Sequence, residues 1–200
     1  MAVSESQAQD QEEQLIDGGK MMSLTDHLGE LRTRVVRALV SVIVIFCIVL
    51  GFTEPVIKFL SEPLMGALPE GNNGLHFTGP LDVFVASIKV ALLGGVVVGA
   101  PFWIYQFWKF FEPALYPKER KYILPFVVIS ALLFFAGVSF AYFVILPEAL
   151  NWLINYGIQV GVPMITIKDY LSLLMIIIFS FGIVFETPVV LVLLAMLDLV

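Results

Sequence analysis

Four long apolar segments dominate the chain, and shorter polar segments separate them. The apolar segments cover residues 35–52, 83–107 and 123–146, and a fourth runs from about residue 170 to 198. A membrane-spanning helix needs about 20 apolar residues. The segments are continuous rather than alternating, which favours helices over the strands of a barrel. The pattern therefore predicts an all-α polytopic membrane protein, a helical bundle with four transmembrane spans.

Prolines lie within or at the end of three of these apolar segments. Pro101 breaks the second apolar segment, Pro147 ends the third, and Pro188 lies inside the fourth. Because proline removes a helical hydrogen bond, we expect a kink at Pro188 that exposes the carbonyl of Val184. In the loops we expect two short amphipathic pieces, at residues 55–60 and 63–68, and a helix from residue 147 that ends at Gly157. These pieces are predicted to form a cap outside the membrane.

The N-terminal segment differs in composition from the rest. Residues 1–20 hold five acids and one base, which predicts a disordered acidic cytoplasmic tail before a membrane-embedded domain over residues 21–200. Leu24, Leu28, Leu31 and Val35 then fall on one face of a helix. We therefore predict an N-terminal amphipathic helix that lies at the inner interface and leads into the first span.

Basic residues predict the orientation of the spans. Eight flank the start of the first span or lie between the second and third, and two lie in the other loops: Lys20, Arg32, Arg34, Arg37, Lys109, Lys118, Arg120 and Lys121 against Lys58 and Lys168. The positive-inside rule places the N-terminus in the cytoplasm. Lys89 lies inside the second span, where its long stem is expected to reach the headgroups.

Composition narrows the possible functions. The chain is 59% hydrophobic with a mean hydropathy of +0.93. Most of its net charge of −6 lies in the acidic N-terminal tail, and such a tail argues against a nucleic-acid partner. It has one cysteine, Cys47, and two histidines, so neither a disulfide nor a metal cluster is expected. The common catalytic motifs are absent. We expect a binding or transport protein that is not an enzyme and needs no cofactor.

Glu186 is the most informative candidate residue. Between residues 170 and 200 the only other Asp, Glu, Lys or Arg is Asp198. A charged side chain at the membrane centre costs roughly 2.5 kcal/mol or more. Glu186 is therefore predicted to face a protein cavity or a watery groove rather than lipid.

Two further acids, Glu30 and Glu119, lie on basic segments next to the membrane. Local ion pairs, such as Glu30 with Arg34 at i,i+4, are one explanation. The other is a pair of carboxylates that binds two arginines of a ligand, because arginine favours carboxylates. The aromatic cluster of residues 102–111 allows the same two interpretations, an interfacial belt or the wall of a peptide-binding surface.

Several strings in this sequence resemble the TatC family, the multi-spanning receptor of the twin-arginine protein translocase. They are His-Leu-Gly-Glu-Leu-Arg-Thr-Arg at residues 27–34, Phe-Phe-Glu-Pro-Ala-Leu-Tyr-Pro-Lys-Glu-Arg at 110–120, Phe-Ala-Tyr-Phe-Val-Ile-Leu-Pro at 140–147 and Phe-Gly-Ile-Val-Phe-Glu-Thr-Pro at 181–188. Together with the aromatic cluster they cover the chain from about Ser23 onward, in order.

The resemblance implies a function and a set of site residues. Such proteins bind the twin-arginine signal peptides of folded cargo in the cell inner membrane, and Glu30 and Glu119 match the acidic contacts to the arginine pair. Arg32, Phe110, Pro113, Leu115 and Tyr116 match neighbouring positions. Glu186 matches an intramembrane glutamate on the concave face of a glove-shaped bundle. There it would meet single-span partners of the TatA or TatB type in an oligomeric complex that uses the proton-motive force.

Two expectations remain beside this interpretation. The family has six spans, so the sequence, which stops at Val200 after four, is expected to be truncated at its C-terminus. The alternative function is a small-solute secondary transporter that uses Glu186 as its proton-coupling acid.

Overall fold

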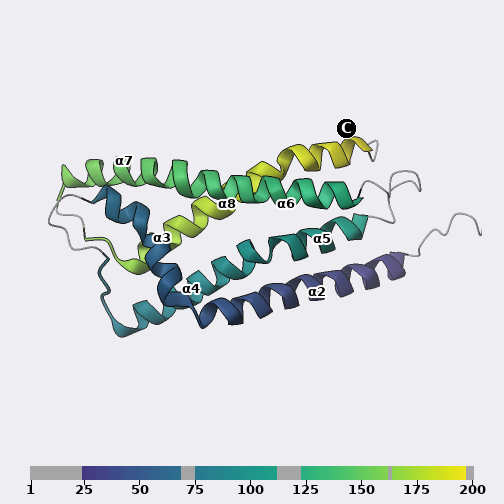
Figure 1. Ribbon diagram of the computed structural model, residues 1–200, viewed down its shortest axis with the longest axis horizontal. Helices are drawn as coiled ribbons and strands as arrows, with labels where there is room; N and C mark the ends of the chain where they lie inside the picture. Colours follow the sequence, from purple (N-terminus) through teal and green to yellow (C-terminus); the bar gives the residue numbers. More distant parts are fainter. Residues whose placement is uncertain (1–23, 69–74, 112–122, 162–163, 197–200) are drawn as a thin grey trace, which may run out of the picture.

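The computed structural model describes residues 24–68, 75–111, 123–161 and 164–196 (Figure 1). Their elements are α2 (Leu24–Leu50), α3 (Thr53–Ala67), α4 (Pro80–Val98), α5 (Ala100–Phe111), α6 (Ile123–Phe140), the π-helix η3 (Ala141–Ile145), α7 (Leu146–Ile158) and α8 (Ile167–Met196). Four segments of the described residues are long and apolar enough to cross a membrane: Gly29–Leu50, Pro80–Val98, Ile123–Ile158 and Ile167–Ala195. The predicted all-α bundle with four spans is confirmed.

Most of the helices run along the length of the bundle, and α3 crosses it obliquely at one end (Figure 1). α2 packs on α4 and α5, α6 packs on α8 and α5, and α3 packs on α7. α2 begins at the end of the bundle where α5 and α8 end and α6 begins. We call this the N-terminal end. α3 and α7 lie at the opposite end, beside the starts of α4 and α8, and we call these two helices the cap.

The amphipathic segment and the first span form one helix. α2 runs without a break from Leu24 to Leu50, so the polar segment forms its first turns and continues straight into the apolar segment. Local hydrogen bonds hold these turns, including one from the Thr33 hydroxyl to the Gly29 carbonyl at 3.0 Å. The boundary predicted at residue 35 is therefore not a structural one.

The second span breaks near Pro101, as predicted. α4 ends at Val98 and α5 begins at Ala100, on the two sides of Gly99. The break disturbs the helical hydrogen bonds around it, and the Trp103 indole donates to the carbonyl of Val96 at 2.9 Å. An aromatic side chain of α5 thus supports the backbone at the end of α4.

The prediction that the third helix ends at Pro147 is wrong. Helix continues from Ile123 to Ile158, and the π-turn η3 lies directly before Pro147. In this turn the Leu146 N–H bonds the Ala141 carbonyl, so the ladder has already changed spacing where Pro147 lacks its donor. These 36 residues extend over about 54 Å. That length exceeds the roughly 30 Å hydrocarbon core of a bilayer.

The cap is built around a helix rather than the two short pieces expected. α3 is continuous with Pro63 inside it. Proline has no N–H, so the carbonyl of Phe59 one turn earlier loses its helical donor. The Tyr142 hydroxyl, from η3, donates to that carbonyl at 2.6 Å, and the Tyr170 hydroxyl donates to the next one, of Leu60. Tyr142 thus replaces the donor that Pro63 lacks, and Tyr170 adds a contact from α8 at the neighbouring carbonyl.

Lys89 has partners within the protein. Its Nζ donates to the Ser172 hydroxyl at 2.6 Å and to the Lys168 carbonyl at 3.1 Å, and its reach to the headgroups stays a prediction. It therefore joins α4 to the first turn of α8.

Close contact between α6 and α8 depends on Gly137. A Cβ at Gly137 would lie 2.6 Å from the Phe181 carbonyl oxygen and 2.9 Å from the Phe185 side chain. Backbone on the facing helix cannot yield to such a contact, so the seam requires glycine here. α8 itself passes through Pro188 as a single helix.

Candidate functional site at the N-terminal end

An apolar groove separates α2 from α5 at the N-terminal end. It encloses about 280 Å³ and is lined by Leu31, Arg34, Val35, Ala38, Trp103, Gln106, Phe107, Phe110 and Phe111. The lining is aromatic on the α5 side and aliphatic on the α2 side, except for the polar groups of Arg34 and Gln106. The aromatic cluster predicted from residues 102–111 thus supplies the wall of a groove. We call it the α2–α5 groove.

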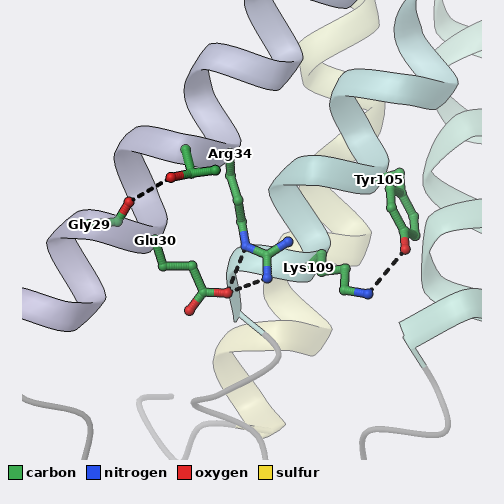
Figure 2. Close-up of polar contacts among 6 residues, drawn as sticks. Gly29, Glu30, Arg34, Tyr105 and Lys109 are labelled. Atoms are coloured by element: carbon green, nitrogen blue, oxygen red, sulfur yellow. Dashed lines mark hydrogen bonds and ion pairs between the residues drawn. The ribbon is translucent and has the colours of Figure 1, made fainter.

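Glu30 lies beside this groove and pairs with Arg34. The Arg34 Nε donates to Glu30 Oε1 at 2.9 Å, and Nη2 donates to the same oxygen (Figure 2). The side chains of Arg34 and Glu30 are 13% and 23% exposed. The predicted i,i+4 ion pair is confirmed. It uses one carboxylate oxygen of Glu30 and leaves Oε2 free of hydrogen bonds among the described residues.

A second cation comes from the facing helix. Lys109 Nζ donates to the Tyr105 hydroxyl at 3.3 Å and lies 5.6 Å from the centre of that ring. Figure 2 shows Lys109 on α5 opposite the Glu30–Arg34 pair on α2. Lys109 thus adds a second cation at the same end of the bundle as the Glu30–Arg34 pair.

The remaining predicted site residues fall into two groups. Phe110 lines the groove with Arg34, whereas Arg32 is exposed on another part of α2 and lines a separate shallow hollow with Gly29, Thr33, Val36 and Arg37. Glu119, Pro113, Leu115 and Tyr116 lie outside the described residues. The structure thus brings Glu30 and Phe110 to the same groove and places Arg32 away from it.

Glu186 faces a second cavity, of about 320 Å³, between α5, α6 and α8. The cavity is lined by Trp103, Ile104, Phe107, Trp108, Phe134, Ile183, Glu186, Thr187, Val190 and Leu191. The carboxyl is half-buried and lines this mostly apolar cavity, and its orientation away from lipid stays a prediction. We call this space the Glu186 cavity.

A buried hydrogen bond lies in the wall of the Glu186 cavity. The Trp108 indole donates to the Ser130 hydroxyl at 2.9 Å, which joins α5 to α6, and Trp108 lines the cavity. Glu186 Oε1 is buried with no hydrogen-bond partner among the described residues. The carboxyl therefore has one oxygen without a donor.

The groove and the cavity share a wall. Trp103 and Phe107 line both, so aromatic surface connects the Glu30 region with Glu186. Gln106 lies on the same helix, and its Oε1 is likewise buried with no partner in the described residues. Three buried acceptor atoms, on Glu30, Gln106 and Glu186, therefore lie along one aromatic surface. A ligand that carries hydrogen-bond donors and an apolar segment would match this arrangement.

Sequence reasoning missed Gln106, Trp108 and Ser130 as site residues. Gln106 is the one amide within an aromatic segment, a signal that could have singled it out. The pairing of Trp108 with Ser130 spans 22 positions between two helices, and no local pattern indicates it. Within the described ranges no group of three or more His, Cys, Asp or Glu residues could hold a metal ion.

A comparison with known families decides the classification. The sequence profile of the family described as Sec-independent protein translocase protein (TatC) matches residues 26–200. The chain belongs to the TatC family. It is 39% identical over 176 residues to the Sec-independent protein translocase protein TatC of Desulforapulum autotrophicum, which covers 88% of this chain and 65% of that protein. It is also 39% identical over 174 residues to TatC of Escherichia coli strain K12, which covers 86% and 66% of the two proteins.

Solved structures agree with this classification. The crystal structure of a twin arginine translocase receptor TatC superimposes with a TM-score of 0.79 at 33% identity, over 87% of this chain and 76% of that one. The chain spans 65% of the length of its Desulforapulum relative.

The family match and the four apolar helices together identify a multi-pass membrane protein of a translocase family, and the family is not one of enzymes.

Proposed function

We propose that this TatC-family chain is the receptor and core subunit of a twin-arginine protein translocase. It binds the twin-arginine signal peptides of folded cargo at the N-terminal end of the bundle. The observation that carries the proposal is Glu30, whose Oε2 is buried without a partner among the described residues, beside an apolar groove. A guanidinium supplies the donors that this oxygen lacks, and the groove offers apolar contacts to the residues around the arginines.

The binding mechanism is electrostatic capture followed by apolar contact. One signal arginine pairs with Glu30 and the other with Glu119, while Phe110 lines the groove beside them. Pro113, Leu115 and Tyr116 complete the contact region in this proposal, and Arg32 borders it from the exposed hollow on α2. Trp103 and Phe107 line both the α2–α5 groove and the Glu186 cavity. The apolar part of the signal then follows the surface of these two side chains toward Glu186.

Glu186 serves assembly in this proposal. Single-span partners of the TatA and TatB type would place a polar group against its open Oε1. A carboxyl in an apolar lining favours such a partner, because an unpaired polar group at this depth is costly. The resulting oligomeric complex would use the proton-motive force for export.

The orientation follows from charge. In the sequence, eight basic residues lie before the first span or between the second and third spans, and two lie in the other two intervals, which supports a cytoplasmic N-terminal end in the cell inner membrane. Signal peptides of cargo made in the cytoplasm would then meet Glu30 directly. Membership of a protein translocase family removes the support for the alternative, a small-solute transporter.

The proposal is tested by measuring the affinity of a fluorescent twin-arginine signal peptide for the chain in lipid nanodiscs. Glu30→Gln and Glu119→Gln are each expected to weaken binding about 10- to 100-fold, because each removes a charge-assisted contact. Glu148→Gln is the matched control, since this carboxylate is exposed on α7 in the cap. Equal affinity for a twin-lysine peptide, or full affinity in both glutamate variants, would overturn the proposal.

A further inference from the structure

Arg34 places on Glu30 the same chemical group that the proposed ligand would bring. Its guanidinium donates twice to Glu30 Oε1, from Nε and from Nη2. Its side chain is only 13% exposed and lines the α2–α5 groove. Resting on the proposed function, we propose that Arg34 is a built-in competitor, which occupies Glu30 in the empty receptor and is displaced by an arginine of the signal peptide.

The geometry offers a route for this exchange. Arg34 uses Oε1, whereas Oε2 has no partner among the described residues. An incoming guanidinium can therefore begin on Oε2 while Arg34 still holds Oε1, and then take both oxygens in the bidentate arrangement that arginine favours. Glu30 is never left as an uncompensated charge during the exchange, which avoids the cost of a buried unpaired carboxylate.

After its displacement from Glu30, the Arg34 guanidinium still has favourable contacts in the groove. Its guanidinium already lies in the groove lined by Phe107 and Phe110, and a guanidinium can stack on aromatic faces. The Arg34–Glu30 ion pair lowers the affinity of every ligand of Glu30, because the ligand must replace Arg34. Peptides that interact with Glu30 more weakly than Arg34 does are therefore not bound.

The internal pair predicts a gain in affinity when it is removed. Ion pairs at i,i+4 are weak when exposed, and this pair is largely buried, so we expect Arg34→Gln to tighten binding of a twin-arginine peptide about two- to tenfold. Arg34→Lys should give a smaller gain, because lysine keeps the charge but loses the two-point contact. Arg37→Gln is the matched control. It removes an equal charge from the same helix, at an exposed position with no carboxylate contact among the described residues.

The experiment measures the affinity of one fluorescent twin-arginine peptide for the wild-type chain and these three variants in nanodiscs. A gain in Arg34→Gln that exceeds the gain in Arg37→Gln is the expected result. Equal gains would show general charge repulsion instead, and weaker binding in Arg34→Gln would show that Arg34 orients Glu30 for the ligand. Either result overturns the inference while the receptor function stands. No binding of the peptide by any protein would overturn both.

A second readout needs no peptide. Carbodiimide coupling of an amine to Glu30, followed by mass spectrometry, reports how well the carboxylate is protected. Removal of Arg34 should raise the labelling rate of Glu30 several-fold, and Arg37→Gln should leave it unchanged. Unchanged labelling in Arg34→Gln would mean that Arg34 does not occupy Glu30, and the inference would fail.

Discussion

The cap and the N-terminal end of the bundle differ in the hydrogen bonding of their buried acceptor atoms. In the cap, Tyr142 and Tyr170 donate to the carbonyls of Phe59 and Leu60, next to Pro63. At the N-terminal end, Glu30 Oε2 and Gln106 Oε1 are buried with no partners among the described residues.

This difference distinguishes contacts that stabilise the fold from groups that remain available to a ligand. A buried polar atom without a partner costs about 1–3 kcal/mol, so a part of the fold that serves only stability removes such atoms, as the cap does. Glu186 adds a third open acceptor, near the wall that the groove and the cavity share. In the proposed function, stability depends on the satisfied contacts of the cap, and recognition depends on the open acceptors of Glu30, Gln106 and Glu186.

The largest effect is expected in the cap. A Tyr142→Phe, Tyr170→Phe double variant should lower the free energy of unfolding by about 2–4 kcal/mol, because two backbone carbonyls lose their hydroxyl donors. Denaturant or thermal unfolding of the purified protein in micelles measures this loss. Tyr156→Phe is the control, since Tyr156 is 62% exposed on α7. A double variant as stable as the wild type would show that the cap does not depend on these contacts.

A double-mutant cycle tests the role of Pro63. Pro63→Ala restores an N–H that can bond the Phe59 carbonyl, so Tyr142→Phe should cost about 1 kcal/mol less in the Pro63→Ala background than in the wild type. The same unfolding measurement provides all four free energies. Strictly additive effects would mean that the Tyr142 hydroxyl does not replace the missing helical donor.

Glu186→Leu is expected to separate stability from function. Removal of a half-buried carboxyl from an apolar lining should leave the free energy of unfolding unchanged or raise it by up to about 1 kcal/mol, while co-purification with single-span partners is lost. Glu186→Gln, which keeps hydrogen-bonding capacity, should retain part of the partner binding. If Glu186→Leu unfolds the protein instead, the carboxyl has a structural role and the contrast with the cap disappears.

Gln106→Leu gives the smallest expected change in stability. It removes an acceptor without a partner, so the free energy of unfolding should change by no more than about 0.5 kcal/mol. Signal-peptide affinity should fall about two- to tenfold, because the ligand loses a neutral hydrogen bond. Gln159→Leu, which changes an exposed amide at the end of α7, is the matched control for both measurements. Full affinity in Gln106→Leu would remove this residue from the binding site.

The sequence predicted the spans well because their apolar length is a local property. It also predicted the break near Pro101, since a missing N–H acts on its own helix. It failed at Pro147 and in α3 because the effect of a proline there depends on distant groups. η3 changes the ladder before Pro147, and Tyr142, 79 positions after Pro63 in the sequence, bonds the carbonyl that Pro63 leaves open.

The site was predictable to a similar degree. Rare charges in apolar or basic segments identified Glu30 and Glu186, because such charges are costly or out of place. The i,i+4 spacing also indicated the pair of Glu30 with Arg34. The open acceptor of Gln106 and the Trp108–Ser130 contact depend on how α5 packs against α2 and α6, and this packing is not visible in any local pattern.

Photo-crosslinking from two positions tests the central claim most directly. A photoreactive residue replaces Val35, which lines the α2–α5 groove, or Tyr156, which is exposed in the cap. Each protein is illuminated with a labelled twin-arginine signal peptide in native membranes. We predict an adduct from position 35 that is lost with a twin-lysine peptide or in the Glu30→Gln background, and none from position 156. Equal adducts from both positions, or an adduct at position 35 that does not depend on the arginine pair, would contradict a receptor site at the N-terminal end.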